Sequence, residues 1–145
     1  MLSHKSMIIC STLMTLFLVL AIIHFYWGFG GRWAFTSAIP VDSNNNPVLS
    51  PTAIDCFIVG IGLLLFGIFY LLQTDLISFN IIYWIRKPLL WVIPLIFLFR
   101  AIGDFKYVGF FKSMRTSEFA TLDYFFFSPL CLAISILGFW VLKKV

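Results

Sequence analysis

The sequence predicts an all-α integral membrane protein whose chain crosses the bilayer four times as an antiparallel helix bundle. Apolar residues make up 61% of the chain, charged residues only 11%, and the mean hydropathy is +1.02. A soluble domain contains roughly 45–50% apolar and 25% charged residues. A membrane-spanning helix needs about 20 residues, so the 145 residues hold four spans and short connections. We therefore expect residues 1–145 to form a single four-helix transmembrane domain.

The first predicted span covers about residues 7–27. A basic start followed by an apolar run also fits a signal peptide, but this run is longer than the ~7–15 apolar residues of such a signal and no small-x-small cleavage site follows it. We therefore expect a retained helix. His24 and Trp27 lie at its end, where aromatic residues favour the membrane interface. Gly28, Gly30 and Gly31 follow and predict a turn.

The second predicted span covers about residues 51–72, after a turn-rich connection over residues 34–50. Pro51 suits a first helical turn, because the N–H that proline lacks has no partner there. Asp55 lies one turn inside this span. A carboxylate at this position is stabilised by the helix dipole, and a role in binding is the alternative.

The third predicted span covers about residues 88–105. The segment before it, 76–87, fits either an interfacial stretch or the first turn of the span. Pro94 predicts a kink. Arg100 and Asp104 are charged residues in an apolar run, and such residues normally face protein or water. Because Arg-then-Asp is the weaker order for a helical pair, we expect each to find its partner on another helix.

The fourth predicted span covers about residues 121–142. Thr121 suits an N-cap and Asp123 lies in the first turn. The Ser128-Pro129 pair predicts a bend, and a pair of lysines ends the span.

An even number of spans places both termini on one side of the membrane. The terminal side, with the second connection, holds five basic residues, and the opposite connections hold four. The positive-inside rule then favours a multi-pass protein of the cell membrane with cytoplasmic termini.

The same parity brings the polar residues of the four spans to one membrane level. The ends of spans one and three and the starts of spans two and four meet there, with Trp27 and Tyr124 at the same level. The charged or titratable residues of this level are His24, Arg32, Asp55, Arg100, Asp104 and Asp123. Three interpretations remain open: a buried ion-pair network, a ligand site open to the outer face, or separate charges facing headgroups.

Other kinds of chemistry lack support in the sequence. Cys10, Cys56 and Cys131 lie in apolar runs without a C-x-x-C pair, and neither H-x-x-x-H nor H-E-x-x-H spacing occurs. We expect no metal and no cofactor. Serine, histidine and aspartate give no defensible hydrolase arrangement, and the scattered basic residues do not indicate nucleic-acid binding.

The chain resembles a bacterial family of small membrane proteins called domain of unknown function 3995. The motifs that carry the resemblance are 23–33 (IHFYWGFGGRW) with 38–40 (AIP), 100–105 (RAIGDF) with 109–110 (GF), and 123–124 (DY) with 128–130 (SPL). Phe127 stands where the family pattern favours tyrosine. The resemblance implies a four-helix membrane domain and no activity.

Three hypotheses of function follow. In the first, a polar pocket between the outer helix ends binds a small anionic or lipid-like ligand, with His24, Trp27, Arg32, Asp55, Arg100, Asp104, Asp123 and Tyr124 as binding residues. In the second, the chain is an immunity or accessory subunit for a membrane protein partner, and its charges are structural. In the third, it is a membrane-embedded acid–base enzyme acting on a lipid-like substrate, with catalytic residues unassigned.

Overall fold

The fold is a bundle of long helices connected by loops, which a computed structural model describes for residues 4–74, 76 and 82–144. The helical elements in chain order are α1 (His4–Gly28), the 3₁₀ turn η1 (Thr36–Ala38), α2 (Ala53–Leu71), α3 (Tyr83–Ile102), α4 (Glu118–Leu122), the π turn η2 (Asp123–Phe127) and α5 (Ser128–Lys144). The last three run on as one helical segment. The described residues form no strand, only an isolated bridge between Val41 and Pro47.

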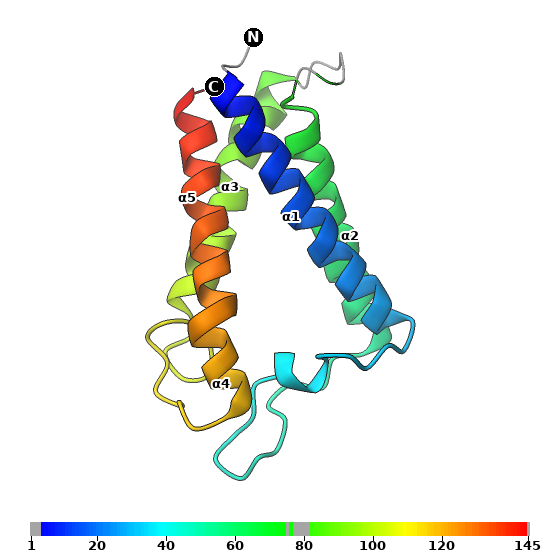
Figure 1. Cartoon of the computed structure of the whole chain (residues 1–145), viewed down its shortest axis with the longest axis vertical. Coiled ribbons are helices and arrows are strands. Elements are labelled where there is room, and N and C mark those ends of the chain that lie inside the picture. The colour runs from blue at the N-terminus through cyan, green and yellow to red at the C-terminus, as the bar shows by residue number, and fades with distance from the viewer. Residues whose placement is uncertain (1–3, 75, 77–81, 145) are drawn as a thin grey trace.

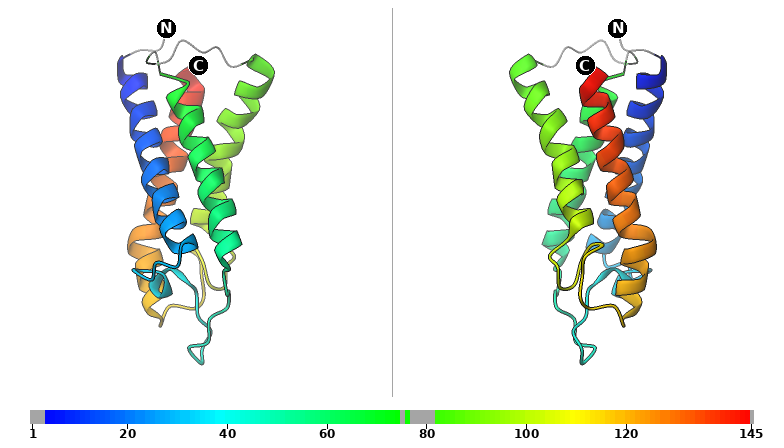
Figure 2. Two further views of the ribbon diagram at one scale, coloured as in Figure 1. Left: turned by 90° about the vertical axis from the view of Figure 1, so that its right-hand side faces the viewer. Right: turned by 90° about the vertical axis from the view of Figure 1, so that its left-hand side faces the viewer.

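The helices form two pairs that diverge like the arms of a V (Figure 1). α1 packs along α2, and α3 packs along α5, while α1 touches α5 much less. Both termini and the start of α3 lie at the closed end, and the loops after α1 and α3 lie at the open end. Views from the sides show the long helices running roughly parallel between these two ends (Figure 2). We call them the terminal end and the loop end.

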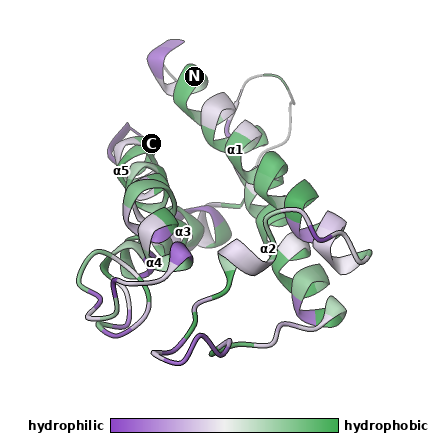
Figure 3. Cartoon of the chain, turned by 60° about the horizontal axis from the view of Figure 1, so that its bottom comes forward, coloured by the Kyte–Doolittle hydropathy of each residue, from purple (hydrophilic) through white to green (hydrophobic). Residues whose placement is uncertain are grey.

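Three helical segments among the described residues are long and apolar enough to cross a membrane: His4–Gly28, Ala53–Leu71 and Glu118–Lys144. Apolar residues also dominate the helices when the molecule is coloured by hydropathy (Figure 3). α3 has 20 residues, but it carries Arg86, Lys87 and Arg100. The described residues confirm the predicted all-helical fold, and three of its helices have the length and composition of membrane spans.

Aromatic rings join the two helix pairs in the middle of the molecule. Phe17 of α1 stacks on Tyr70 of α2 at 5.8 Å and contacts Phe97 of α3 at 5.3 Å between ring centroids. All three residues are buried. Glycines allow close contact within each pair: a Cβ at Gly60 would lie 2.8 Å from the Phe25 ring, and one at Gly138 would lie 2.5 Å from Pro94.

α1 ends in a glycine turn, as predicted. The Gly31 N–H donates to the carbonyl of Tyr26 at 2.9 Å, the Gly30 N–H donates to that of Trp27 at 3.0 Å, and Gly30 has φ +92°. This is the Schellman pattern, in which a left-handed glycine satisfies the last carbonyls of a helix.

All four predicted helix starts differ from the structure. α1 begins at His4 and not near residue 7. α2 begins at Ala53 with Thr52 as N-cap, so Pro51 lies outside the helix. The last segment begins at Glu118 with Ser117, not Thr121, as N-cap: its hydroxyl accepts the Ala120 N–H at 3.0 Å.

α3 begins at Tyr83 and not near residue 88, and Pro88 lies inside it. The N–H that Pro88 lacks would bond the carbonyl of Trp84, so α3 continues past this proline without that bond. α3 ends at Ile102 and not near residue 105, because Gly103 takes φ +90°. The predicted segment 76–87 lies partly outside the described residues.

Candidate functional site

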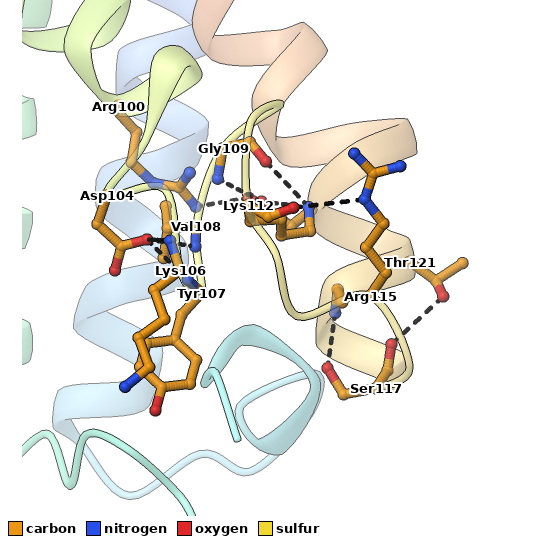
Figure 4. Close-up of polar contacts among 12 residues, drawn as sticks. Arg100, Asp104, Lys106, Tyr107, Val108, Gly109, Lys112, Arg115, Ser117 and Thr121 are labelled. Carbon is orange, nitrogen blue, oxygen red and sulfur yellow. Dashed lines mark hydrogen bonds and ion pairs between the residues drawn. The ribbon is translucent and has the colours of Figure 1, made fainter. Parts of the chain in front are cut away.

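A buried ion-pair cluster around Asp123 occupies the loop end between α3 and η2 (Figure 4). The Asp123 side chain is completely buried. One of its carboxylate oxygens accepts from Arg100 Nη2 at 2.9 Å, and the other accepts from Lys112 Nζ at 2.8 Å and from the Gly109 N–H at 2.7 Å. Two cations therefore surround one carboxylate, and the cluster carries a net charge of +1.

A π turn presents Asp123 to this cluster. The Ser128 N–H donates to the Asp123 carbonyl, an i→i+5 bond. Pro129 follows directly, and an α-helix through this point would press its ring against the Phe125 carbonyl. The wider turn explains the predicted bend, and such turns are frequent at functional sites.

The loop after α3 folds back to bring Lys112 to the cluster. Gly103 and Gly109 both have φ +90°, and a Cβ at Gly109 would lie 2.3 Å from the Ile102 carbonyl oxygen. The Phe110 N–H then donates to the Ala101 carbonyl at 2.8 Å. Only glycine fits two backbone segments this close, so the loop is closed against the helix end.

Lys112 is the member of the cluster that sequence reasoning missed. It lies in the connection between the third and fourth predicted spans, yet only 1% of its side chain is exposed, and its Nζ also donates to the Gly109 carbonyl at 3.2 Å. The signal for burial is the apolar run 108–111 directly before it. Large apolar side chains favour burial, so a connection that carries such a run packs against the rest of the protein.

Asp104 organises the loop and makes no ion pair with Arg100. One oxygen accepts the N–H groups of Lys106, Tyr107 and Val108 at 2.7–2.9 Å. Partial burial would raise its pKa, but these three backbone donors outweigh burial and hold the pKa of Asp104 below its ordinary value. The expected partner on another helix is therefore found for Arg100 but not for Asp104.

Asp55 forms a capping box at the start of α2. Its carboxylate accepts the Thr52 N–H and hydroxyl, both at 2.8 Å, while the Asp55 N–H donates to Thr52 Oγ1 at 3.3 Å. This arrangement satisfies donors at the helix start and accounts for Asp55 without a ligand.

His24, Trp27 and Arg32 lie on the other arm of the V. His24 Nδ1 is 2.8 Å from the Leu20 carbonyl, and its ring contacts Trp27 at 5.1 Å. The Trp27 indole N–H donates to the Trp33 carbonyl at 2.8 Å. Arg32 is exposed. The eight predicted residues thus share one end of the molecule, but only Arg100 and Asp123 come into direct polar contact.

Tyr124 flanks the cluster from η2. Its ring packs edge-on against Phe110 at 5.8 Å, and Lys112 Nζ lies 5.7 Å from the ring centroid. The ring is 43% exposed, so Tyr124 separates the buried lysine from the surroundings.

Two buried polar atoms near Asp123 have no hydrogen-bond partner: Arg100 Nη1 and Ser128 Oγ. Ser128 is wholly buried, while about a third of the Arg100 side chain, 34%, is exposed. Buried donors usually have hydrogen-bond partners. Arg100 Nη1 and Ser128 Oγ are exceptions, and both lie beside a positively charged cluster. No group of three or more potential metal ligands occurs among the residues that the structure describes.

These features define a small all-helical protein with membrane-compatible helices and a buried charge cluster at one end. Residues 17–138 match the family described as "Protein of unknown function (DUF3995)", and the chain belongs to that family. The match confirms the resemblance seen in the sequence motifs. No curated protein and no solved structure matches the chain.

Proposed function

We propose that this chain is a four-span membrane protein that binds a small anionic or lipid-like ligand at its loop end, with Arg100 as the anchor. The observation that carries the proposal is the surplus cation. Lys112 alone neutralises Asp123, yet Arg100 is also held there, half-buried, with Nη1 unpartnered. An uncompensated charge at membrane depth costs about 2.5–3.5 kcal/mol on insertion scales, which an anionic ligand would offset.

The proposal includes α3 as the fourth span. Its 20 residues extend for about 30 Å, the thickness of the hydrocarbon core. Its basic residues lie near its two ends, where Arg86 Nε donates to Gln73 at 2.7 Å and Arg100 pairs with Asp123. Charges near helix ends reach the interface by extending their side chains, so they do not prevent α3 from crossing.

The ligand that suits this site carries a carboxylate or phosphate group. A guanidinium fork binds both groups in bidentate fashion. The Arg32 guanidinium offers further donors on the opposite arm, because it has no hydrogen-bond or ion-pair partner among the residues that the structure describes. His24 Nδ1–H donates to the Leu20 carbonyl at 2.8 Å, and in this tautomer Nε2 is an acceptor on the same arm. The carboxylates of Asp55 and Asp104 serve their own segments, and we assign them to local structure.

A direct test uses two single-chain probes, oleate and dodecyl phosphate, added to the protein in neutral detergent. We expect native mass spectrometry to detect one bound probe on the wild type, and Arg100→Gln to reduce the bound fraction at least tenfold. Lys106→Gln is the matched control, since Lys106 is an exposed loop cation without an ion pair. Equal binding by the wild type and Arg100→Gln would refute the proposal.

A second candidate function is a subunit of a membrane complex whose charges are structural. The complete burial of Asp123, with both oxygens bonded, favours it. In that case Arg100→Gln would lower the melting temperature, and neither probe would bind the wild type.

We also propose that the termini lie in the cytoplasm of a multi-pass cell-membrane protein. The terminal end holds five basic residues and, by sequence position, one acidic residue, so it carries the whole net charge of +4; the loop end holds five of each. This asymmetry follows the positive-inside rule. Thiol labelling of intact cells should modify Asn45→Cys and leave Lys144→Cys unmodified; the reverse result would invert the orientation.

A further inference from the structure

A groove of about 520 Å³ lies alongside α1 at the terminal end, far from the ion-pair cluster. Successive turns of α1 line it, from His4 through Ser11 to Leu16, and Thr74 and Leu76 close it after α2. The proposed function at the loop end leaves this groove unexplained.

The length of the groove matches one leaflet of a bilayer. Residues 4–16 of an α-helix extend for about 18 Å, while half of a ~30 Å hydrocarbon core is about 15 Å. The groove therefore reaches from the membrane surface to near the midplane. An occupant of this length is a lipid of that leaflet, not a lipid crossing the bilayer.

The deep part of the groove accepts an acyl chain despite its hydroxyl groups. Thr12 Oγ1 donates to the Ile8 carbonyl and Thr15 Oγ1 to the Ser11 carbonyl, each at 2.9 Å, and Thr74 Oγ1 donates to Leu71 at 2.6 Å. The protons of these three hydroxyls are already hydrogen-bonded to backbone carbonyls of the chain. A hydrocarbon lying along these three threonines leaves none of their donors unpaired, which would otherwise be costly. Ser11 is the exception, because its hydroxyl has no hydrogen-bond partner among the described residues.

The shallow end of the groove is basic. His4 lines it, and the next residue, Lys5, is exposed in the same helical turn. Lys143 and Lys144 end α5, whose last turn lies near the start of α1 (Figures 1 and 2). Lysines and arginines close to a membrane surface attract anionic headgroups.

We propose that this groove is a binding site for an anionic phospholipid of the leaflet on the terminal side. The phosphate lies by His4 and Lys5, and one acyl chain follows α1 past Ser11 to Thr15. The site is separate from the Arg100 site and does not depend on it.

The experiment compares phosphatidylglycerol with phosphatidylcholine. The protein is purified in neutral detergent with equal amounts of both lipids, and native mass spectrometry measures the lipid that each molecule retains. We expect the wild type to retain one phosphatidylglycerol at least fivefold over phosphatidylcholine. Ser11→Phe should lose the retained lipid because it fills the groove, and the double substitution His4→Gln with Lys5→Gln should reduce the preference to about one.

Val19→Phe is the matched control, because Val19 lies on the same helix outside the groove and is 50% exposed. It should retain the lipid. All variants are compared in an Arg100→Gln background, so that lipid held at the loop end does not contribute. In that background, equal retention of both lipids by the otherwise wild-type protein would overturn the proposal, and so would retention by a folded Ser11→Phe protein. A wild-type dimer that Ser11→Phe converts to a monomer would also overturn it and would assign the groove to a partner helix.

Discussion

Lys112 and Asp123 form a 2.8 Å ion pair in which the two side chains are only 1% and 0% exposed. The lysine comes from a loop and the aspartate from a π turn, so this contact joins the end of α3 to the start of the last helical segment. In a chain with so few charges, it fixes how these two elements meet. Removal of this ion pair should destabilise the whole α3–α5 arm, whether or not a ligand binds.

Asp123→Asn should therefore strongly destabilise the protein. It leaves Lys112 and Arg100 without a counter-charge, and removing one partner of a buried ion pair costs about 3–5 kcal/mol. Unfolding in mixed micelles, followed by helical circular dichroism, measures the change. The triple variant Arg100→Met, Lys112→Met, Asp123→Leu should recover part of the loss, because no charge then remains buried. A fully stable Asp123→Asn protein would show that the pair contributes little.

Gly109→Ala should disrupt the loop that carries Lys112. A Cβ at this position would lie 2.3 Å from the Ile102 carbonyl oxygen, and the backbone has φ +90°. We expect a loss of stability above the ~1 kcal/mol typical of point substitutions. Gly62→Ala is the control: a Cβ there meets nothing within 4 Å, so stability should stay the same or rise by up to about 1 kcal/mol. Similar losses in both variants would contradict the role of the loop closure.

Asp104 should make the loop sensitive to acid. Its folded-state pKa lies below the ordinary value of 3.8, so its ionised form adds stability above that pH, and this stability is lost as the pH falls through the lower, folded-state pKa. Hydrogen exchange at the Tyr107 and Val108 amides reports on this loop. Exchange should be faster in Asp104→Asn than in the wild type at pH 6, and the difference should shrink below about pH 4. If the difference in exchange rate between Asp104→Asn and the wild type grew toward low pH, the ionised Asp104 carboxylate would not be the group that stabilises this loop.

The helices could be predicted from sequence because their causes are local. Apolar runs mark the spans, and Gly28–Gly31 marks the end of α1. The start of α3 could not be located, because proline is common in the first turn of a helix and Pro88 instead lies inside α3. Lys112 could not be assigned to the cluster because its burial depends on the positive φ angles of Gly103 and Gly109, which set the path of the loop in space.

The same distinction applies to the candidate site. Counting spans places His24, Asp55, Arg100 and Asp123 at one end of the molecule, and the structure agrees. Counting spans does not tell whether the helices at that end converge or diverge. Their divergence separates His24 and Asp55 from the cluster, and Asp55 then finds its donors in its own helix start.

The described contact across the open end of the V can be tested by cross-linking. Ser37 Oγ of η1 donates to Glu118 Oε1 of α4 at 2.7 Å, and η1 and α4 are in contact. In a background with all three native cysteines replaced by alanine, a short bifunctional thiol reagent should cross-link Ser37→Cys with Glu118→Cys. The pair Asp55→Cys and Asp123→Cys should not react, because these residues belong to opposite arms. Mass spectrometry of digested protein identifies the linked peptides. Efficient cross-linking of the second pair would mean that the two arms can close, which would bring position 55 to the Arg100 cluster, as the single polar level predicted from the sequence requires.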